Sequence, residues 1–245
     1  MPGIDLSAEL GSRGWVAPDR DRLVAMAQRA RLEMVVIGAQ RALWEDVAAG
    51  NAETAEAVAN QPLLRGWVVV TPTQSEASIA DLRRYLARGQ FLGAWLHART
   101  ADDLARDGTQ EILGAYRRFA RPLLVSCPDF ATLQAVEAIA RSIPQMKFVL
   151  RGAAGDDWAE AIVAAKRTVN LILEPFTGGY HRAKLEAMVA TLGEHRIVFA
   201  TGYPAGNPGA ALGLLAEARL ADTDKQAILT RNSQRLFGLG RAREE

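Results

Sequence analysis

Cysteine and histidine are both scarce in this chain, which has one cysteine and three histidines in 245 residues. The single cysteine, Cys127, cannot form an intramolecular disulfide, so nothing points to an oxidising compartment. No apolar run approaches the roughly 20 residues that span a bilayer. The first residues also lack the basic segment and apolar core of a secretory signal. We therefore expect a cytoplasmic protein with no membrane partner.

An excess of one charge is absent too. Lysine and arginine together number 29 and aspartate and glutamate 28, which gives a formal net charge of +1 and an isoelectric point near 7.9. Such a balance offers no electrostatic reason to expect a nucleic-acid partner. Hydrophobic residues make up 49% of the chain, as in ordinary globular proteins. The sequence shows no linker, so we expect a single domain over residues 1–245.

Short apolar runs bounded by polar and turn residues recur along the chain and predict buried strands. Stretches with helical spacing of apolar residues follow these runs. The eight predicted strands are Ile4–Ser7, Met34–Ile37, Trp67–Val70, Leu92–Leu96, Leu123–Ser126, Phe148–Leu150, Val169–Leu173 and Ile197–Ala200. One predicted helix begins at Asp19. The others span 51–60, 76–88, 110–120, 130–143, 158–166, 182–192, 210–220 and 223–237.

Eight strands that alternate with helices predict an α/β fold, a (β/α)8 TIM barrel, closed by C-terminal helices at about 210–237. An open doubly wound sheet is the alternative, but the first strand-to-helix turn has no glycine-rich phosphate loop. In a barrel, functional residues lie at the C-terminal ends of the strands. The last residues of each predicted strand are therefore the candidates.

The segment Arg196–Pro204 reads Arg-Ile-Val-Phe-Ala-Thr-Gly-Tyr-Pro. It resembles the closing strand of the amidohydrolase-2 family of metal-dependent hydrolases, R-I-L-F-G-S-D-Y-P. The segments 4–9, 93–97, 122–126, 148–152, 170–174 and 229–239 are similar to further motifs of that family, in the same order. The resemblance covers nearly the whole chain and implies the family's barrel.

The resemblance also implies where a metal site would lie, and other residue types occupy those positions here. Ser7 and Glu9 stand where the family has two histidines, and Ser126 and Arg151 each stand where it has one. In addition, Trp95 replaces a lysine that bridges metals in some members, and Gly202 replaces the catalytic aspartate. Glycine has no ligating side chain, serine is a poor zinc ligand, and arginine repels cations. We therefore expect neither a metal nor another cofactor.

Three functions follow, and all stay open at this point. The leading one is a degenerate amidohydrolase-2-like barrel, a pseudoenzyme that binds a small anionic molecule or assembles as a homo-oligomer or beside an active homologue. The alternative is a metal-independent lactone or ester hydrolase, with His97 or Glu9 as general base and Arg151 as anion anchor. In a third, Glu9, His97 and Glu174 would hold a displaced metal. The predicted pocket residues are Ser7, Glu9, Trp95, His97, Ser126, Arg151, Glu174 and Tyr203.

Other reactive side chains have simpler interpretations. Cys127 fits a buried inert thiol better than a nucleophile, because a nucleophile needs a base or cation beside it. Arg99 and Arg182 could join Arg151 in binding a carboxylate, or form surface ion pairs. His181 and His195 are expected in a solvated loop and at the surface.

Overall fold

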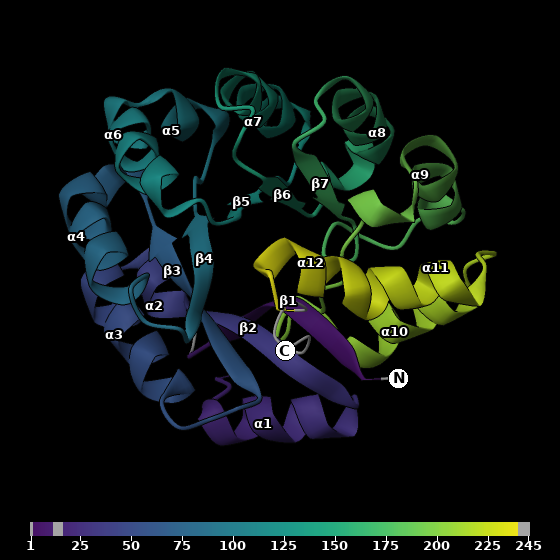
Figure 1. Ribbon diagram of the computed structural model, residues 1–245, viewed down its shortest axis with the longest axis horizontal. Coiled ribbons are helices and arrows are strands. Elements are labelled where there is room, and N and C mark those ends of the chain that lie inside the picture. The colour runs from purple at the N-terminus through teal and green to yellow at the C-terminus, as the bar shows by residue number, and fades with distance from the viewer. Residues whose placement is uncertain (1, 12–16, 240–245) are drawn as a thin grey trace, which may run out of the picture.

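Seven parallel strands form one curled sheet at the centre of the molecule (Figure 1). The computed structural model describes residues 2–11 and 17–239. Neighbours in the sheet follow the order of the chain, and each pairing is parallel. The strands are β1 (Gly3–Leu10), β2 (Leu32–Ala39), β3 (Leu64–Val70), β4 (Phe91–Leu96), β5 (Leu123–Ser126), β6 (Phe148–Arg151) and β7 (Leu171–Glu174).

The segment 197–203 lies between the two edges of this sheet. On one side, Ile197 bridges Leu173 of β7 in parallel, and the amide of Val198 donates to the Leu173 carbonyl at 3.0 Å. On the other side, the Leu6 amide donates to Phe199 at 3.1 Å, and the Glu9 amide donates to Tyr203 at 2.7 Å. The predicted strand Ile197–Ala200 thus runs where expected, but with a single β-bridge rather than as a regular strand. The fold is a TIM-barrel-like single α/β domain.

Helices cover the outer face of the sheet (Figure 1). Asp19 caps the first one, because its side chain accepts the Arg22 amide at 2.9 Å. The helices are α1 (Arg20–Arg29), α2 (Gln40–Trp44), α3 (Val47–Val58), α4 (Ser75–Tyr85), α5 (Ala101–Ala105), α6 (Asp107–Tyr116), α7 (Phe130–Ser142), α8 (Trp158–Arg167), α9 (Lys184–Leu192), α10 (Pro208–Glu217), α11 (Asp222–Gln226) and α12 (Asn232–Phe237). The short α2 and α5 were not predicted from the sequence. None of the helices in the described part of the chain is long and apolar enough to cross a membrane.

The C-terminal helices return to the start of the sheet. A π-helical turn, Ala227–Arg231, joins α11 to α12, so the predicted helix 223–237 is continuous in path but not regular α-helix. The side-chain Nδ2 of Asn232 donates to the carbonyls of Glu194 and Ile197 at 2.7 and 2.8 Å. The ring of Phe237 lies 5.5 Å from that of Trp67. These contacts attach the last helix to the N-terminal end of the sheet.

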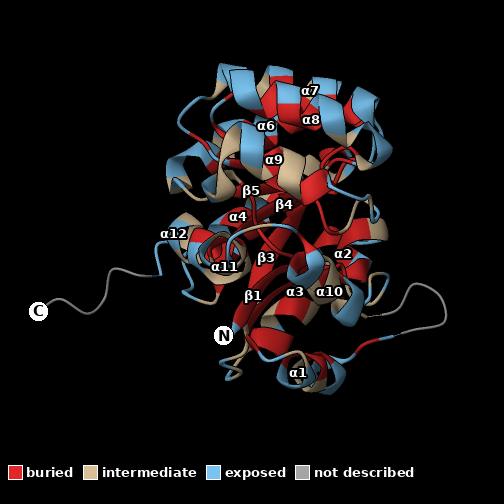
Figure 2. Cartoon of the chain, turned by 90° about the vertical axis from the view of Figure 1, so that its right-hand side faces the viewer, coloured by how far each residue is buried: buried red, intermediate tan, exposed pale blue. Residues whose placement is uncertain are grey.

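The strands are buried on both faces, as the red interior of Figure 2 shows. Large aromatic side chains fill the space that the sheet encloses, and Trp67 and Trp95 are 0% and 1% exposed. Trp67 also donates its indole N–H to the Leu6 carbonyl at 2.7 Å. Gly93 is required by this packing, because a Cβ there would come within 2.3 Å of the Pro122 carbonyl oxygen. The core is therefore filled inside the curl and covered by helices outside it.

Candidate functional site

Two adjacent cavities open at the C-terminal ends of the strands, with volumes of about 570 and 500 Å³. They share Trp44, Arg151 and Thr177. The first is also lined by Glu9, Gln40, Phe176, Gly179, Tyr180, Gly202, Ala205, Gly206 and Asn207. The second is also lined by His97, Ala98, Arg99, Ser126, Cys127, Pro128, Gly152, Gly155, Asp156 and Gly178. In parallel barrels this end carries the functional residues.

Arg151, the last residue of β6, connects the strand ends around these cavities. Its Nε donates to Ser7 Oγ at 2.7 Å, and its Nη2 donates to Glu9 Oε1 at 2.9 Å. The guanidinium carbon lies 4.9 Å from the ring centroid of Trp95, which is a cation–π distance. The side chains of Arg151 and Glu9 are 19% and 12% exposed. Three predicted pocket positions from β1 and β4 thus converge on a single arginine.

The second carboxylate oxygen of Glu9 is bound as well. Gln40, which opens α2 directly after β2, donates its Nε2 to Glu9 Oε2 at 3.0 Å. This hydrogen bond fixes the amide orientation and leaves Oε1 of Gln40 as an acceptor. Gln40 is only 6% exposed, and Oε1 has no hydrogen-bond partner among the described residues. A buried acceptor without a donor is costly, so this oxygen marks a place where a ligand could donate.

The predicted residues of β4 and β5 lie beside this group. Trp95 donates its indole N–H to Ser126 Oγ at 3.0 Å, and its own ring is buried. His97, directly after β4, is buried, with its ring in edge contact with Trp44 at 4.5 Å. Both Ser126 and His97 line the second cavity. Ser7 and Trp95 contact Arg151 but line neither cavity.

Glu174, the last residue of β7, builds the loop that follows it. Its carboxylate accepts the backbone amides of Gly152, Phe176 and Thr177 at 2.7–3.1 Å, and also the Thr177 hydroxyl. Complete burial raises the pKa of Glu174, although these donors and the charge of Arg151 oppose the rise. We predicted Glu174 as a pocket residue. Glu174 instead uses its oxygens on the loop 175–179 and does not line either cavity.

Lys184, at the start of α9, binds the same loop through hydrogen bonds to its carbonyls. Its buried Nζ donates to the carbonyls of Pro175 and Gly179 at 2.7 and 2.6 Å. Burial lowers the pKa of Lys184 to about 8, although the charges of Glu174 and Asp156 oppose the shift. Two buried groups of opposite charge therefore fix the loop that supplies Thr177 and Gly179 to the cavities.

The turn after the eighth strand segment is attached to β1. Asp5, which is fully buried, accepts the amides of Ser7 and Thr201 at 3.0 and 2.9 Å and the Thr201 hydroxyl. Burial raises the pKa of Asp5 to about 6. Gly202 follows with φ +64°, and a Cβ there would lie 2.7 Å from the Thr177 methyl group. This position is therefore shaped for glycine.

The remaining candidates take no part in the side-chain bonds around Arg151. Tyr203 uses its backbone to bind β1, and its side chain lines neither cavity. Arg99 lines the second cavity and donates to the Trp44 carbonyl at 3.0 Å, whereas Arg182 is exposed and His195 lies at the surface. His181 Nε2 lies 3.1 Å from Asp156 Oδ1. Cys127 is buried, and burial raises its pKa to about 12, which keeps it a neutral thiol.

Several residues of the site were not found from the sequence. Gln40 and Trp44 belong to α2, which has only five residues and therefore no readable periodicity. Thr177, Tyr180 and Asn207 lie in loops. The available signal was position alone, since Gln40 lies three residues after the predicted strand Met34–Ile37.

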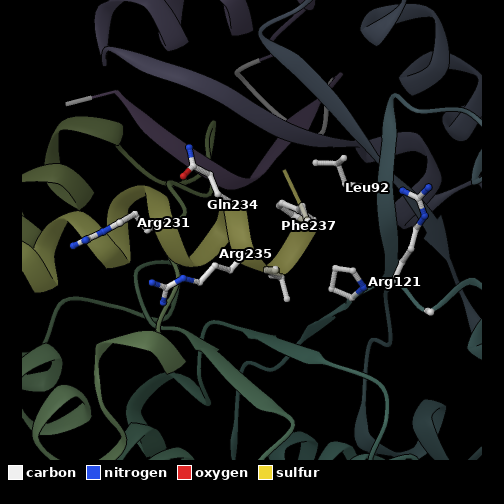
Figure 3. Close-up of a pocket in the computed structure, with 10 residues that line it drawn as sticks. Leu92, Arg121, Arg231, Gln234, Arg235 and Phe237 are labelled. Carbon is white, nitrogen blue, oxygen red and sulfur yellow. The ribbon is translucent and has the colours of Figure 1, made fainter. Parts of the chain in front are cut away.

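Another cavity, of about 760 Å³, lies at the opposite, N-terminal end of the sheet (Figure 3). It is lined by Leu92, Ala120, Arg121, Pro122 and residues of the last helical segment: Arg231, Gln234, Arg235, Leu236, Phe237 and Gly238. Arg121 donates to the Phe91 carbonyl at 2.8 Å, and Arg231 donates to that of Thr223. Residues at this end of a barrel generally serve stability. We therefore assign the candidate site to the other end.

Comparisons with known proteins show the family and the fold of this chain. A family model described as amidohydrolase matches residues 19–239. The chain therefore belongs to the amidohydrolase-2 family. None of the curated proteins matches it.

Solved decarboxylase structures have the same fold. A 2,6-dihydroxybenzoate decarboxylase from Rhizobium is 14% identical with a TM-score of 0.77, and the match covers 97% of this chain and 99% of that one. A dihydroxybenzoic acid decarboxylase from Polaromonas, with bound manganese and 2-nitroresorcinol, is 17% identical with a TM-score of 0.76 over 98% of both chains. A 5-carboxyvanillate decarboxylase from Novosphingobium aromaticivorans, complexed with manganese, is 12% identical with a TM-score of 0.75 over 97% and 96%. At such identities the likeness establishes the fold alone.

The residues of this chain do not fit a manganese ion at the cavity. Within residues 2–11 and 17–239, no group of three or more His, Cys, Asp or Glu side chains is placed to hold a metal. The side chains that converge are one carboxylate, a hydroxyl, an indole and a guanidinium. Divalent manganese prefers several oxygen or imidazole ligands, and a guanidinium at contact distance repels it.

Proposed function

We propose that this chain is a metal-free amidohydrolase-2 barrel that binds a small anionic molecule at the C-terminal ends of its strands. One observation carries the proposal. The Arg151 guanidinium bonds Ser7 and Glu9, so a cation of the protein itself lies where the strand ends meet. In the described part of the chain its Nη1 makes no hydrogen bond, and the side chain borders both cavities. Arginine recognises carboxylates through such free N–H groups.

The proposal also covers the closure of the barrel, the location of the chain in the cell and its assembly. Residues 197–203 serve as the eighth strand of a closed (β/α)8 barrel, supported by their backbone bonds to both β1 and β7. The chain acts in the cytoplasm as a homo-oligomer or beside an active homologue. The near-neutral charge supports a function without nucleic acid.

Metal content and ligand binding together test this function. Elemental mass spectrometry on the wild-type chain, purified without chelator and incubated with manganese or zinc, should find far less than one ion per chain. Calorimetry with 2,6-dihydroxybenzoate, named from the Rhizobium neighbour, should show binding that EDTA does not change. Substitution Arg151→Gln should abolish binding, whereas Arg182→Gln, which alters an exposed arginine outside both cavities, should not. Stoichiometric metal in the wild-type chain would refute the proposal.

A second candidate is the metal-independent lactone or ester hydrolase. It is favoured by the shared location of Glu9, Gln40 and Arg151 on the first cavity, where a base and an anion anchor would be needed. Against it, both oxygens of Glu9 are already hydrogen-bonded. Turnover of small lactones that Glu9→Gln abolishes, with wild-type folding retained, would make this the function instead.

A further inference from the structure

We infer that the groups around the Arg151 guanidinium form a built site for one planar monovalent cation, which the protein fills with its own side chain. The inference rests on the metal-free function proposed above and deepens it. It assigns the charge at this point to the chain itself rather than to a bound ion. Shortening Arg151 should therefore open a site for free guanidinium.

The enclosure of the guanidinium is the first support. Glu9 Oε1 and Ser7 Oγ accept its N–H groups from β1 at 2.9 and 2.7 Å. The indole of Trp95 faces it from β4 at 4.9 Å from carbon to ring centroid. On another side, a Cβ placed on Gly202 would be 3.7 Å from Nη2. Two strands and the turn after the eighth strand segment thus surround it.

The chemistry of these groups is the second support. A carboxylate and a hydroxyl accept hydrogen bonds from a planar donor, and an aromatic face favours a weakly hydrated cation. Together they supply one negative charge, which matches a monovalent cation. They lack the several hard oxygen ligands that manganese requires.

The burial of Glu9 makes the loss of Arg151 costly in stability. Its carboxylate is largely buried, and Arg151 is its ion-pair partner. Without the guanidinium, Glu9 would keep only the hydrogen bond from Gln40 and its charge would be uncompensated. Removing one member of a buried pair is strongly destabilising, because the remaining charge has lost both water and partner.

Chemical rescue tests the inference in the full-length chain. We expect Arg151→Ala to lower Tm by roughly 5 to 15 °C. Millimolar guanidinium chloride should restore a substantial part of this loss in the variant and leave the wild type unchanged. Sodium chloride at equal ionic strength and urea, a planar molecule without charge, should not restore it. The control Arg182→Ala removes an exposed arginine and should show neither loss nor rescue.

A second variant keeps the test decisive if Arg151→Ala does not fold. In Glu9→Gln/Arg151→Ala the buried charge is gone together with its partner, so this chain should fold and should not respond to guanidinium. Equal effects of guanidinium and urea on Arg151→Ala, or a guanidinium response of the double variant, would overturn the inference. That failure would leave the metal-free binding function standing, because its tests are the metal content and the ligand binding of the wild-type chain.

Discussion

Individual buried groups in this protein have their chemistry set by what surrounds them. Cys127 directly follows Ser126 beside the second cavity, a place where a nucleophile would be useful. Yet its thiol is 1% exposed, and burial raises its pKa to about 12. Burial without a neighbouring base or cation favours the neutral thiol.

We predict that native Cys127 reacts slowly with iodoacetamide. At mildly alkaline pH the native thiol should be modified on the order of 100-fold more slowly than the thiol of the urea-unfolded chain, because only the thiolate attacks. Mass spectrometry over time measures both rates. Comparable rates for the native and unfolded chains would show that Cys127 is an accessible, activated thiol.

Asp5 provides a prediction for the dependence of stability on pH. Burial raises its pKa from 3.8 to about 6, so the folded chain binds this proton more tightly than the unfolded chain does. The contribution of Asp5 to stability is therefore full below pH 3.8 and falls as pH rises through about 6. Asp5→Asn removes this titration while keeping an acceptor for the Ser7 and Thr201 amides.

The stability of Asp5→Asn relative to wild type should accordingly improve between about pH 4 and 7, by up to about 3 kcal/mol. Urea unfolding of both chains across this range measures the difference. The control Asp21→Asn, at an exposed position of α1, should give a profile parallel to wild type. A parallel profile for Asp5→Asn as well would contradict the prediction.

At the scale of elements, the loop 175–179 after β7 is ordered by two buried groups rather than by its own sequence. Glu174 accepts its amides, and Lys184 of α9 donates to its carbonyls. Thr177 and Gly179 of this loop form part of the cavity wall. The shape of the site therefore depends on a lysine that does not contact the cavity.

We predict that Lys184→Met loosens this loop. Losing two buried hydrogen bonds should cost about 1–3 kcal/mol and should speed amide exchange at Phe176 and Thr177. Hydrogen-exchange mass spectrometry measures the second effect. Lys166→Met, at an exposed position of α8, is the matched control and should change neither quantity. Unchanged exchange in Lys184→Met would mean that Glu174 alone orders the loop.

The cost of the buried ammonium group should also vary with pH. Because its pKa is lowered from 10.5 to about 8, the folded chain gives up this proton more readily than the unfolded chain. The desolvation penalty on the Lys184 ammonium group is therefore full below pH 8 and diminishes as pH rises toward 10.5.

At the scale of the whole molecule, packing inside the curled sheet couples distant parts of the chain. Trp67 of β3 binds the Leu6 carbonyl of β1 and contacts Phe237 of α12. The segment 197–203 joins β7 to β1. A single core of this kind should unfold cooperatively.

We predict that Trp67→Ala lowers the free energy of unfolding by about 3–5 kcal/mol, since it leaves a cavity and an unbound carbonyl. Unfolding in urea should remain one transition, with coincident fluorescence and far-UV circular dichroism curves. Val169→Ala, at a position 69% exposed, should cost little. Separate transitions in the wild-type chain would indicate independently folding parts.

The fold was largely predictable because it depends on local patterns. Buried parallel strands appear as apolar runs, and the runs at Leu123–Ser126 and Phe148–Leu150 match β5 and β6 within one residue. The segment 197–200 was predicted from the same kind of run. It makes an isolated bridge to β7 and separate backbone bonds to β1 instead of a regular ladder, which an apolar run cannot reveal.

By itself the sequence determined the order of the elements, the family, and the residue types at the strand ends, since these follow from apolar periodicity and motif spacing. Only the tertiary structure decided which of those residues meet. Ser7 and Glu9 lie about 140 residues from Arg151, and their bonds arise only because the curled sheet brings β1 and β6 together. Gln40 joined them through a helix too short to have a readable period. Side-chain contacts across a barrel have no signature along the chain, because they depend on how the sheet curls.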